Sequence, residues 1–301
     1  MTTEQPDPGA PFTGEAGMVV GIDGSTGSAH ALRWAAARTD RFGPLRPVMT
    51  WHYPWWAASS PGPPPMIDFE AEARRSAEEL VGPARADGVL DPIVCRGRPG
   101  PTLVQIGATA RLVVVGNRGH NALTDAILGS VSAHVVAHST VPVAVVPGSA
   151  PIDLPHRRVV VGADGSDESI DAVRWALVNT PAEETVEVLH SWTYPMAARA
   201  DIPAGDYPAN EDLARAVLDA TIAAALDGLG VEGAQERIVP RLEFGDPRAS
   251  LIDAARSADL LILGARGRGG LAHLLLGSVT TALVHRPVVA TVVVPHPERQ
   301  G

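Results

Sequence analysis

The chain repeats itself, and this internal repeat is the strongest constraint on its fold. The segment "MVVGIDGS" at 18–25 returns as "VVVGADGS" at 159–166, and "MTWHYP" at 49–54 returns as "HSWTYP" at 190–195, each 141 residues later. Near the end of each copy, "GNRGHNALTDAILGS" at 116–130 returns as "GARGRGGLAHLLLGS" at 264–278. We therefore expect two homologous domains, which suits a chain of 301 residues.

The repeat also sets the expected boundaries. Domain 1 spans 17–147 and domain 2 spans 157–296, joined by a linker at 148–156. The acidic, Pro- and Gly-rich residues 1–16 predict a disordered tail, and residues 297–301 form a short C-terminal tail. The N-terminus does not read as a signal peptide, and no apolar run approaches the roughly 18 residues that span a bilayer. We expect a cytoplasmic protein without a membrane segment.

Within each copy, five short β-branched runs alternate with segments of helical period. Runs that are apolar on both faces, such as "LVVVG" at 112–116 and "LLILG" at 260–264, are typical of parallel strands covered by helices. The sequence therefore predicts an α/β fold with two tandem, doubly wound, five-stranded parallel-sheet domains.

Charge and residue usage exclude several classes of function. The net charge of −10 argues against nucleic-acid binding, which relies on basic surfaces. All 24 basic residues are arginine, so Schiff-base chemistry and a Walker P-loop, which both need lysine, are excluded. A single cysteine, Cys95, rules out an internal disulfide and suits a reducing cytoplasm; it follows an apolar strand and is expected to be buried and inert.

Two motifs fall at the carboxyl ends of the expected strands, where open parallel sheets bind ligands. Asp23 and Asp164 follow the first strand of each copy, and Ser25 and Ser166 are placed to cap the next helix. The second motif ends the fourth strand and opens the last helix. Glycines there allow close approach of a ligand, and a helix N-terminus favours phosphate. The first strand lacks G-x-G-x-x-G, which excludes a dinucleotide fingerprint.

In both copies the second motif is glycine, two residues, glycine, nine residues, then Gly-Ser. With the aspartate after the first strand, this pattern resembles the universal stress protein family, whose ATP-binding members carry both features. The resemblance covers nearly the whole chain as a tandem pair. It implies a fold like that of the adenine nucleotide α-hydrolases, ATP across the strand ends with or without Mg²⁺, and pairing of the two domains through their last strands. A homodimer is also compatible with it.

The resemblance assigns nucleotide-binding roles position by position. Asp23 and Asp164 are expected to face the adenine, Thr50 and Ser191 to line the adenine and ribose pocket, and the glycine loops to follow the ribose and phosphates. The expected ligand-binding residues are Gly21, Asp23, Gly24, Ser25, Thr50, Gly116, Arg118, Gly119, Gly129, Ser130 and Val131 in domain 1, and Gly162, Asp164, Gly165, Ser166, Ser191, Gly264, Arg266, Gly267, Gly277, Ser278 and Val279 in domain 2.

Each of these features also has a structural interpretation. The Asp-Gly pairs are common turn residues, and Arg118 and Arg266 are equally compatible with solvated loop charges. His134 and His138 have a spacing that can bind zinc, but no third ligand is evident, so a plain helical face is favoured. Trp34 and Trp175 recur at one helical position and are expected in the core. The Pro-rich loop 53–66, with two tryptophans, is interpreted as a lid or partner surface.

The leading functional hypothesis is an ATP-binding stress or regulatory protein with one nucleotide pocket per domain and no dedicated catalytic residue. Slow ATP hydrolysis or nucleotidyl transfer is the alternative, and a scaffold with vestigial pockets is a third. Hydrolysis needs a base or metal-binding acid at the phosphate end, yet Asp125 of the first copy is replaced by His273 in the second. No protein partner is indicated, and metal ligands are not expected.

Overall fold

The computed structural model describes residues 17–52, 68–117, 128–152, 158–193, 207–268 and 275–296. The chain divides into two compact units between Gly148 and Ser149, inside the expected linker. Both expected tails, the loop 53–66 and linker residues 153–156 lie outside the described residues.

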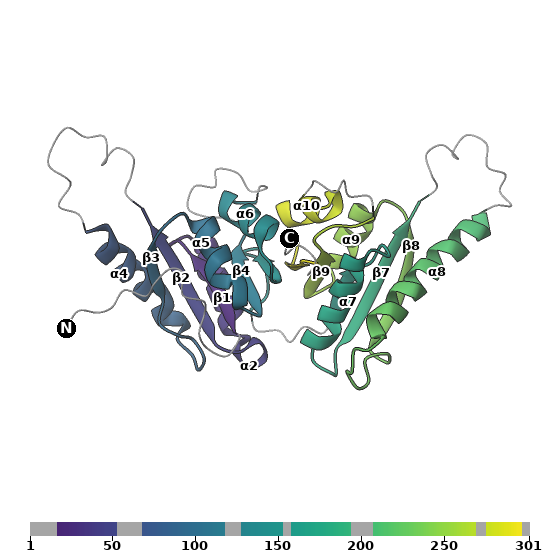
Figure 1. Cartoon of the computed structure of the whole chain (residues 1–301), viewed down its shortest axis with the longest axis horizontal. Helices are drawn as coiled ribbons and strands as arrows, with labels where there is room; N and C mark the ends of the chain where they lie inside the picture. The colour runs from purple at the N-terminus through teal and green to yellow at the C-terminus, as the bar shows by residue number, and fades with distance from the viewer. Residues whose placement is uncertain are drawn as a thin grey trace. The chain divides into compact units, whose positions relative to one another are not determined.

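Unit 1 alternates strands and helices in the predicted way (Figure 1). Its elements are β1 (Met18–Ile22), α1 (Thr26–Ala36), α2 (Thr39–Phe42), β2 (Leu45–Trp51), α4 (Phe69–Val81), η1 (Gly82–Ala84), β3 (Ile93–Arg96), α5 (Pro99–Ile106), η2 (Gly107–Thr109), β4 (Leu112–Gly116), α6 (Ser130–His138) and β5 (Val143–Val146). The strand order is β3-β2-β1-β4-β5, and all neighbours are parallel.

Unit 2 repeats this plan with longer second and third strands. Its elements are β6 (Arg158–Gly162), α7 (Asp167–Asn179), β7 (Thr185–Trp192), α8 (Tyr207–Leu226), β8 (Ile238–Phe244), α9 (Pro247–Ala255), β9 (Leu260–Gly264), α10 (Ser278–His285) and β10 (Ala290–Val294). The order β8-β7-β6-β9-β10 is again parallel throughout. The predicted fold class is therefore confirmed.

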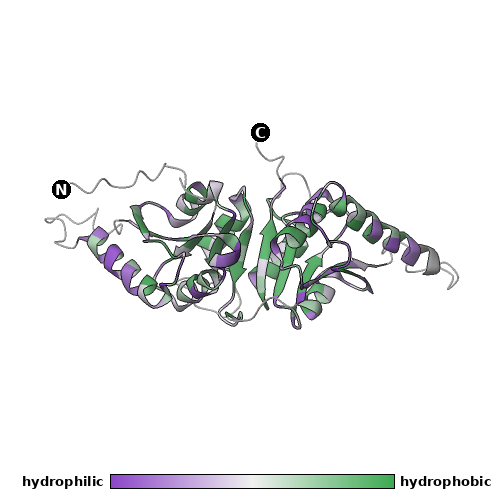
Figure 2. Ribbon diagram, turned by 90° about the horizontal axis from the view of Figure 1, so that it is seen from below, coloured by the Kyte–Doolittle hydropathy of each residue, from purple (hydrophilic) through white to green (hydrophobic). Residues whose placement is uncertain are grey.

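Helices cover both faces of each sheet, so the central strands are apolar throughout. In unit 1, α1 and α4 pack on one face and α5 and α6 on the other; in unit 2 the corresponding pairs are α7 with α8 and α9 with α10. Figure 2 shows the strands of both units as mainly hydrophobic ribbons. All five residues of both β4 and β9 are buried, and each fully buried Leu or Val contributes about 1.5–3 kcal/mol to folding. Trp34 is 1% exposed, as expected for a core residue, whereas Trp175 is only partly buried.

Polar side chains cap the ends of several helices. The predicted caps at Ser25 and Ser166 are confirmed: each hydroxyl accepts a hydrogen bond from the backbone N–H three residues later, at 3.1 and 3.2 Å. At the other end, the Arg174 guanidinium donates to the carbonyls of Ala224 and Ala225, the last turn of α8. These contacts satisfy backbone groups that a helix leaves unpaired at its ends.

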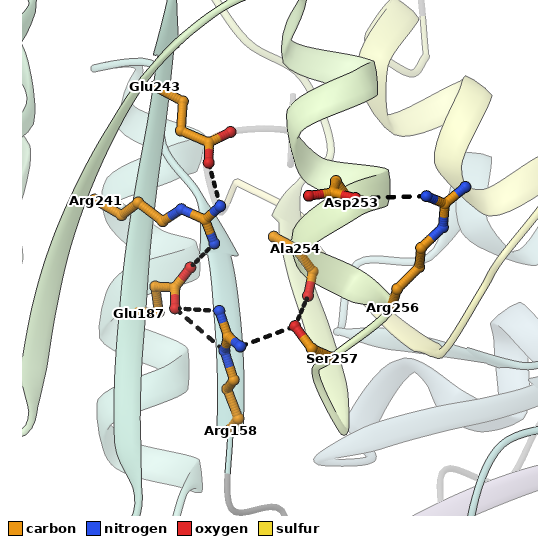
Figure 3. Close-up of polar contacts among 8 residues, drawn as sticks. All are labelled: Arg158, Glu187, Arg241, Glu243, Asp253, Ala254, Arg256 and Ser257. Atoms are coloured by element: carbon orange, nitrogen blue, oxygen red, sulfur yellow. Dashed lines mark hydrogen bonds and ion pairs between the residues drawn. The ribbon is translucent and has the colours of Figure 1, made fainter.

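The sheet face next to α9 carries a row of charges on β6, β7 and β8 (Figure 3). Glu187, 8% exposed, accepts from Arg158 Nη2 at 2.8 Å and from Arg241 Nη1 at 2.8 Å, and Arg241 also pairs with Glu243. The Glu187 hydrogen bonds raise the pKa of the Arg241 guanidinium. β8 is the last strand in the order of its unit. Its proline, Pro240, and its charged side chains both disfavour pairing with a further strand.

The strand order reverses between β1 and β4 in unit 1 and between β6 and β9 in unit 2. These are the points at which connections leave toward opposite sides of the sheet. The carboxyl ends of the first and fourth strands of each unit lie side by side there, at the place where doubly wound folds bind ligands.

Candidate functional site

Unit 2 has a cavity of about 380 Å³ at this position. The strand ends, the start of α9 and the first turn of α10 surround it. Its lining residues are Gly162, Ala163, Asp164, Ser169, Leu189, Ser191, Pro247, Leu251, Leu263, Gly264, Arg266, Gly267, Gly277, Ser278, Val279 and Thr280. The cavity volume lies within the range of small-molecule pockets, roughly 300–1,000 Å³.

The turn after β6 is tied to the loop after β9 through one carboxylate. Asp164 Oδ1 accepts hydrogen bonds from the Ser166 N–H at 3.1 Å and its hydroxyl at 2.6 Å, and Asp164 Oδ2 accepts from the Arg268 N–H at 2.8 Å. Gly165, with φ of 81°, makes this turn possible. Asp164 thus lines the cavity while it holds the two loop segments together. In unit 1, Asp23 makes the corresponding turn contact with the Ser25 N–H at 3.0 Å, with Gly24 at φ 87°.

The first glycine of each loop is needed for packing. A Cβ at Gly264 would lie 2.7 Å from the carbonyl oxygen of Glu168 in α7, and a Cβ at Gly116 would lie 2.9 Å from the Gly27 carbonyl in α1. The second glycine of the unit 2 loop meets the aspartate instead, because a Cβ at Gly267 would lie 2.1 Å from Asp164 Oδ2. Close contacts within the protein, with backbone at Gly264 and Gly116 and with a carboxylate at Gly267, therefore explain these glycines even before any ligand is considered.

The last helix of each unit is anchored to the strand end by a repeated pair of hydrogen bonds. The Gly277 N–H donates to Ala265 O at 2.9 Å, and the Thr280 hydroxyl donates to Gly264 O at 2.8 Å. The corresponding bonds in unit 1 run from Gly129 to Asn117 at 3.0 Å and from Ser132 to Gly116 at 2.6 Å. In the described part of the chain, no side chain caps α6 or α10. Ser278 and Val279, in the uncapped first turn of α10, line the cavity, and such a helix start favours an anion.

A hydroxyl without a partner lies at the opposite end of the site. Ser191, near the carboxyl end of β7, lines the cavity and has a buried Oγ that finds no hydrogen-bond partner among the described residues. Leaving a buried hydroxyl unpaired costs about 1–3 kcal/mol, which a ligand atom can recover. The neighbouring His190 ring donates from Nδ1 to Ala163 O at 2.8 Å and so fixes the adjacent strand end. Thr50 occupies the Ser191 position in unit 1 and is partly buried.

Most of the predicted unit 2 residues line one cavity, and two of them do not. Gly165 and Ser166 are absent from the lining and shape the turn and the helix cap instead. In unit 1, Gly21 leaves room for Leu103, as Gly162 does for Leu251 in unit 2. Ser130 and Val131 begin α6. Arg118, Gly119 and Asp125 lie outside the described residues, as do Gly269, Gly270 and His273 of the second loop.

Sequence reasoning missed the apolar wall of the cavity and two hydroxyls. Leu189, Leu251 and Leu263 form the wall, and nothing in their sequence context separates them from ordinary core leucines. Ser169 and Thr280 did carry a signal, since a hydroxyl recurs at the same places in unit 1, as Ser28 and Ser132.

The two histidines considered as zinc ligands lie one turn apart on α6. Their rings stack with centroids 4.1 Å apart, and His138 Nδ1 donates to His134 O at 2.8 Å. Burial, His138 and Arg98 lower the pKa of His134. Among the described residues, no third side chain completes a metal-binding group.

These features define a class of protein: a tandem pair of doubly wound α/β domains with a glycine loop and a helix N-terminus at the switch point of each sheet. The family model "Universal stress protein family" matches residues 17–147 and again 155–295. The chain belongs to the universal stress protein family. No helix in the described ranges is long and apolar enough to cross a membrane.

Similar proteins match along nearly the full chain. Universal stress protein Rv2005c of Mycobacterium tuberculosis is 34% identical over 298 residues, covering 92% of this chain and 96% of that protein. Universal stress protein Rv2623 of the same species is 30% identical, covering 91% and 95%. A crystal structure of a universal stress protein from Archaeoglobus fulgidus superposes with a TM-score of 0.63 at 19% identity, covering 94% of this chain and 99% of that one. That last likeness supports the fold.

Proposed function

We propose that this protein binds ATP or ADP, one nucleotide per domain, and acts in a regulatory or stress-response role in the cytoplasm, with at most weak ATP hydrolysis. The observation that carries the proposal is the cavity of unit 2, which joins the unpaired Ser191 hydroxyl to the uncapped N-terminus of α10. A ligand that fills it needs an apolar ring system with polar edges at one end and an anion at the other.

A nucleotide meets both requirements. The apolar wall of Leu189, Leu251 and Leu263 suits a purine face, and Ser191 offers its hydroxyl to the ribose or the base edge. Gly267 and the Gly277–Val279 turn supply backbone approach and N–H donors for phosphates. Arg266 also lines the cavity and carries a positive charge that suits phosphate. Any Mg²⁺ would accompany the phosphates and stabilise their charge.

The test is native purification of the full chain, followed by chromatography of the nucleotide released on denaturation. We expect ATP or ADP to be released, and calorimetry of the emptied protein to show binding with and without Mg²⁺. Absence of released nucleotide together with no calorimetric binding would falsify the proposal. ADP formation measured with saturating ATP separates binding from hydrolysis.

A further inference from the structure

An ion pair lies beside the phosphate end of the unit 2 cavity. Arg266 lines the cavity, and its Nε lies 3.2 Å from Glu168 Oε1, with side chains 22% and 15% exposed. Glu168 belongs to the first turn of α7, and its backbone packs directly against Gly264, where a Cβ would come within 2.7 Å. The carboxylate is thus attached to a fixed point of the fold and not to a loop.

This ion pair places the Glu168 carboxylate beside the Nε of the guanidinium. Among the described residues, Arg266 pairs with Glu168 and with no other side chain, so its two Nη groups remain available as donors. Arg266 is also next to the start of α10, since a Cβ on Gly277 would lie 3.3 Å from Arg266 Cα. A planar guanidinium that is fixed along one edge presents its other donors in a set direction, which suits the oxygens of a phosphate.

We propose that Glu168 is a positioning residue that orients Arg266 for a phosphate chain, so that the second domain selects nucleoside polyphosphates over nucleosides. This inference rests on the proposed nucleotide function. It does not extend to domain 1, where Gly27 stands at the position of Glu168 and the first turn of α1 contains no acidic residue.

If the Glu168 carboxylate acts by orienting Arg266, its removal should weaken ATP binding; if it acts only through its charge, its removal should strengthen ATP binding. Glu168 carries a negative charge near the bound phosphates, so its charge alone weakens their binding. Glutamine keeps an oxygen in the position next to Nε and removes only the charge. Alanine, a good helix former, removes both. If orientation matters, Glu168→Ala weakens ATP binding while Glu168→Gln retains or strengthens it; if charge alone matters, both variants bind ATP more tightly.

The experiment uses the full chain with Gly129→Trp to obstruct the first pocket, and titrates ATP and adenosine by calorimetry. We expect Glu168→Ala to lower ATP affinity about fivefold and to leave adenosine affinity unchanged. Asp253→Ala, which removes an exposed carboxylate of α9 outside the cavity lining, is the charge-matched control and should not alter either affinity. Thermal unfolding confirms that each variant is folded.

A double-mutant cycle completes the test. Arg266→Ala should remove most of the preference for ATP over adenosine, and in that background Glu168→Ala should cause no further loss. If the parent chain binds ATP and Glu168→Ala binds it equally well, or if alanine and glutamine at 168 act alike, the positioning role is wrong while nucleotide binding stands. If the parent chain binds neither ATP nor ADP, the proposed function fails and this inference with it.

Discussion

The carboxylate of Asp164 accepts a hydrogen bond from the backbone N–H of Arg268 at 2.8 Å, across 104 residues of sequence. Its other oxygen holds the Ser166 N–H and hydroxyl. One side chain thus joins the turn after β6 to the loop after β9, the two segments that border the cavity. The site depends on this contact for its shape as well as for its charge.

Replacing this aspartate should therefore weaken ligand binding more than it weakens the fold. Asp164→Ala removes three hydrogen bonds, each worth about 0.5–1.5 kcal/mol at a part-exposed site. We expect ATP affinity in the second domain to fall about tenfold or more. The ATP affinity of Asp164→Asn, which keeps one oxygen acceptor, should fall less. Calorimetry of both variants is the check, and equal affinities for Asp164→Ala and the parent chain would contradict the role.

The Glu187 carboxylate should be a major contributor to the stability of unit 2. It lies between Arg158 and Arg241, and removing it leaves two guanidinium groups facing each other beside the sheet (Figure 3). We expect Glu187→Ala to lower the free energy of unfolding by about 1–3 kcal/mol, less than for a fully buried pair because both arginines are partly exposed. Urea unfolding measures this. Glu183→Ala, which removes an exposed carboxylate from the turn before β7, is the control, and an equal loss there would argue against a specific network.

The sole cysteine should be unreactive in the folded protein and should report on unit 1. Cys95 is 6% exposed in β3, and burial raises the pKa of its thiol. Because only the thiolate reacts, we expect labelling at pH 8 to be about tenfold or more slower than in urea. The folded state favours the protonated thiol, so this group's contribution to stability is lost as the pH rises above the unfolded pKa, about 8.5. Fast labelling of the native chain would show that β3 opens readily.

Much of this architecture followed from the sequence because the repeat marks equivalent positions. The strand ends, the helix starts at Ser130 and Ser278, and the caps at Ser25 and Ser166 are local features of pattern and spacing. The Glu168 contact with Arg266 and the cavity leucines depend on which elements meet in space. The sequence also suggested a ligand reason for Gly264, whereas the structure shows a packing reason, because α7 passes directly over it.

Pairing of the two domains through their last strands stays a prediction. In unit 1 the strand order ends at β5, and in unit 2 it ends at β10; both strands are apolar, as "VAVV" and "ATVVV". An apolar edge strand left open favours association. We expect residues 1–148 and 149–301, expressed together as separate chains, to co-purify as a complex. Halves that are folded and remain separate at micromolar concentration would count against it.

The two nucleotide sites should be unequal, with the second binding more tightly. After Gly267 the second loop reads Arg268-Gly269-Gly270, whereas the first reads His120-Asn121-Ala122 after Gly119. If the last of these positions needs positive φ, alanine there costs about 1 kcal/mol or more, which corresponds to roughly a fivefold loss of affinity. The first loop also has a histidine in place of an arginine, so it offers less positive charge to a triphosphate at pH 7.

The structure gives a further reason to expect tighter binding at the second site. Arg266 of the second loop forms an ion pair with Glu168, whose counterpart in the first copy is Gly27. A side chain that is oriented before binding loses less conformational entropy when the nucleotide arrives. The measurement is ATP titration of Gly129→Trp, which keeps the second site, against Gly277→Trp, which keeps the first. We expect the first variant to bind at least about fivefold more tightly; equal affinities would mean that neither the loop glycines nor the arginine contacts distinguish the sites.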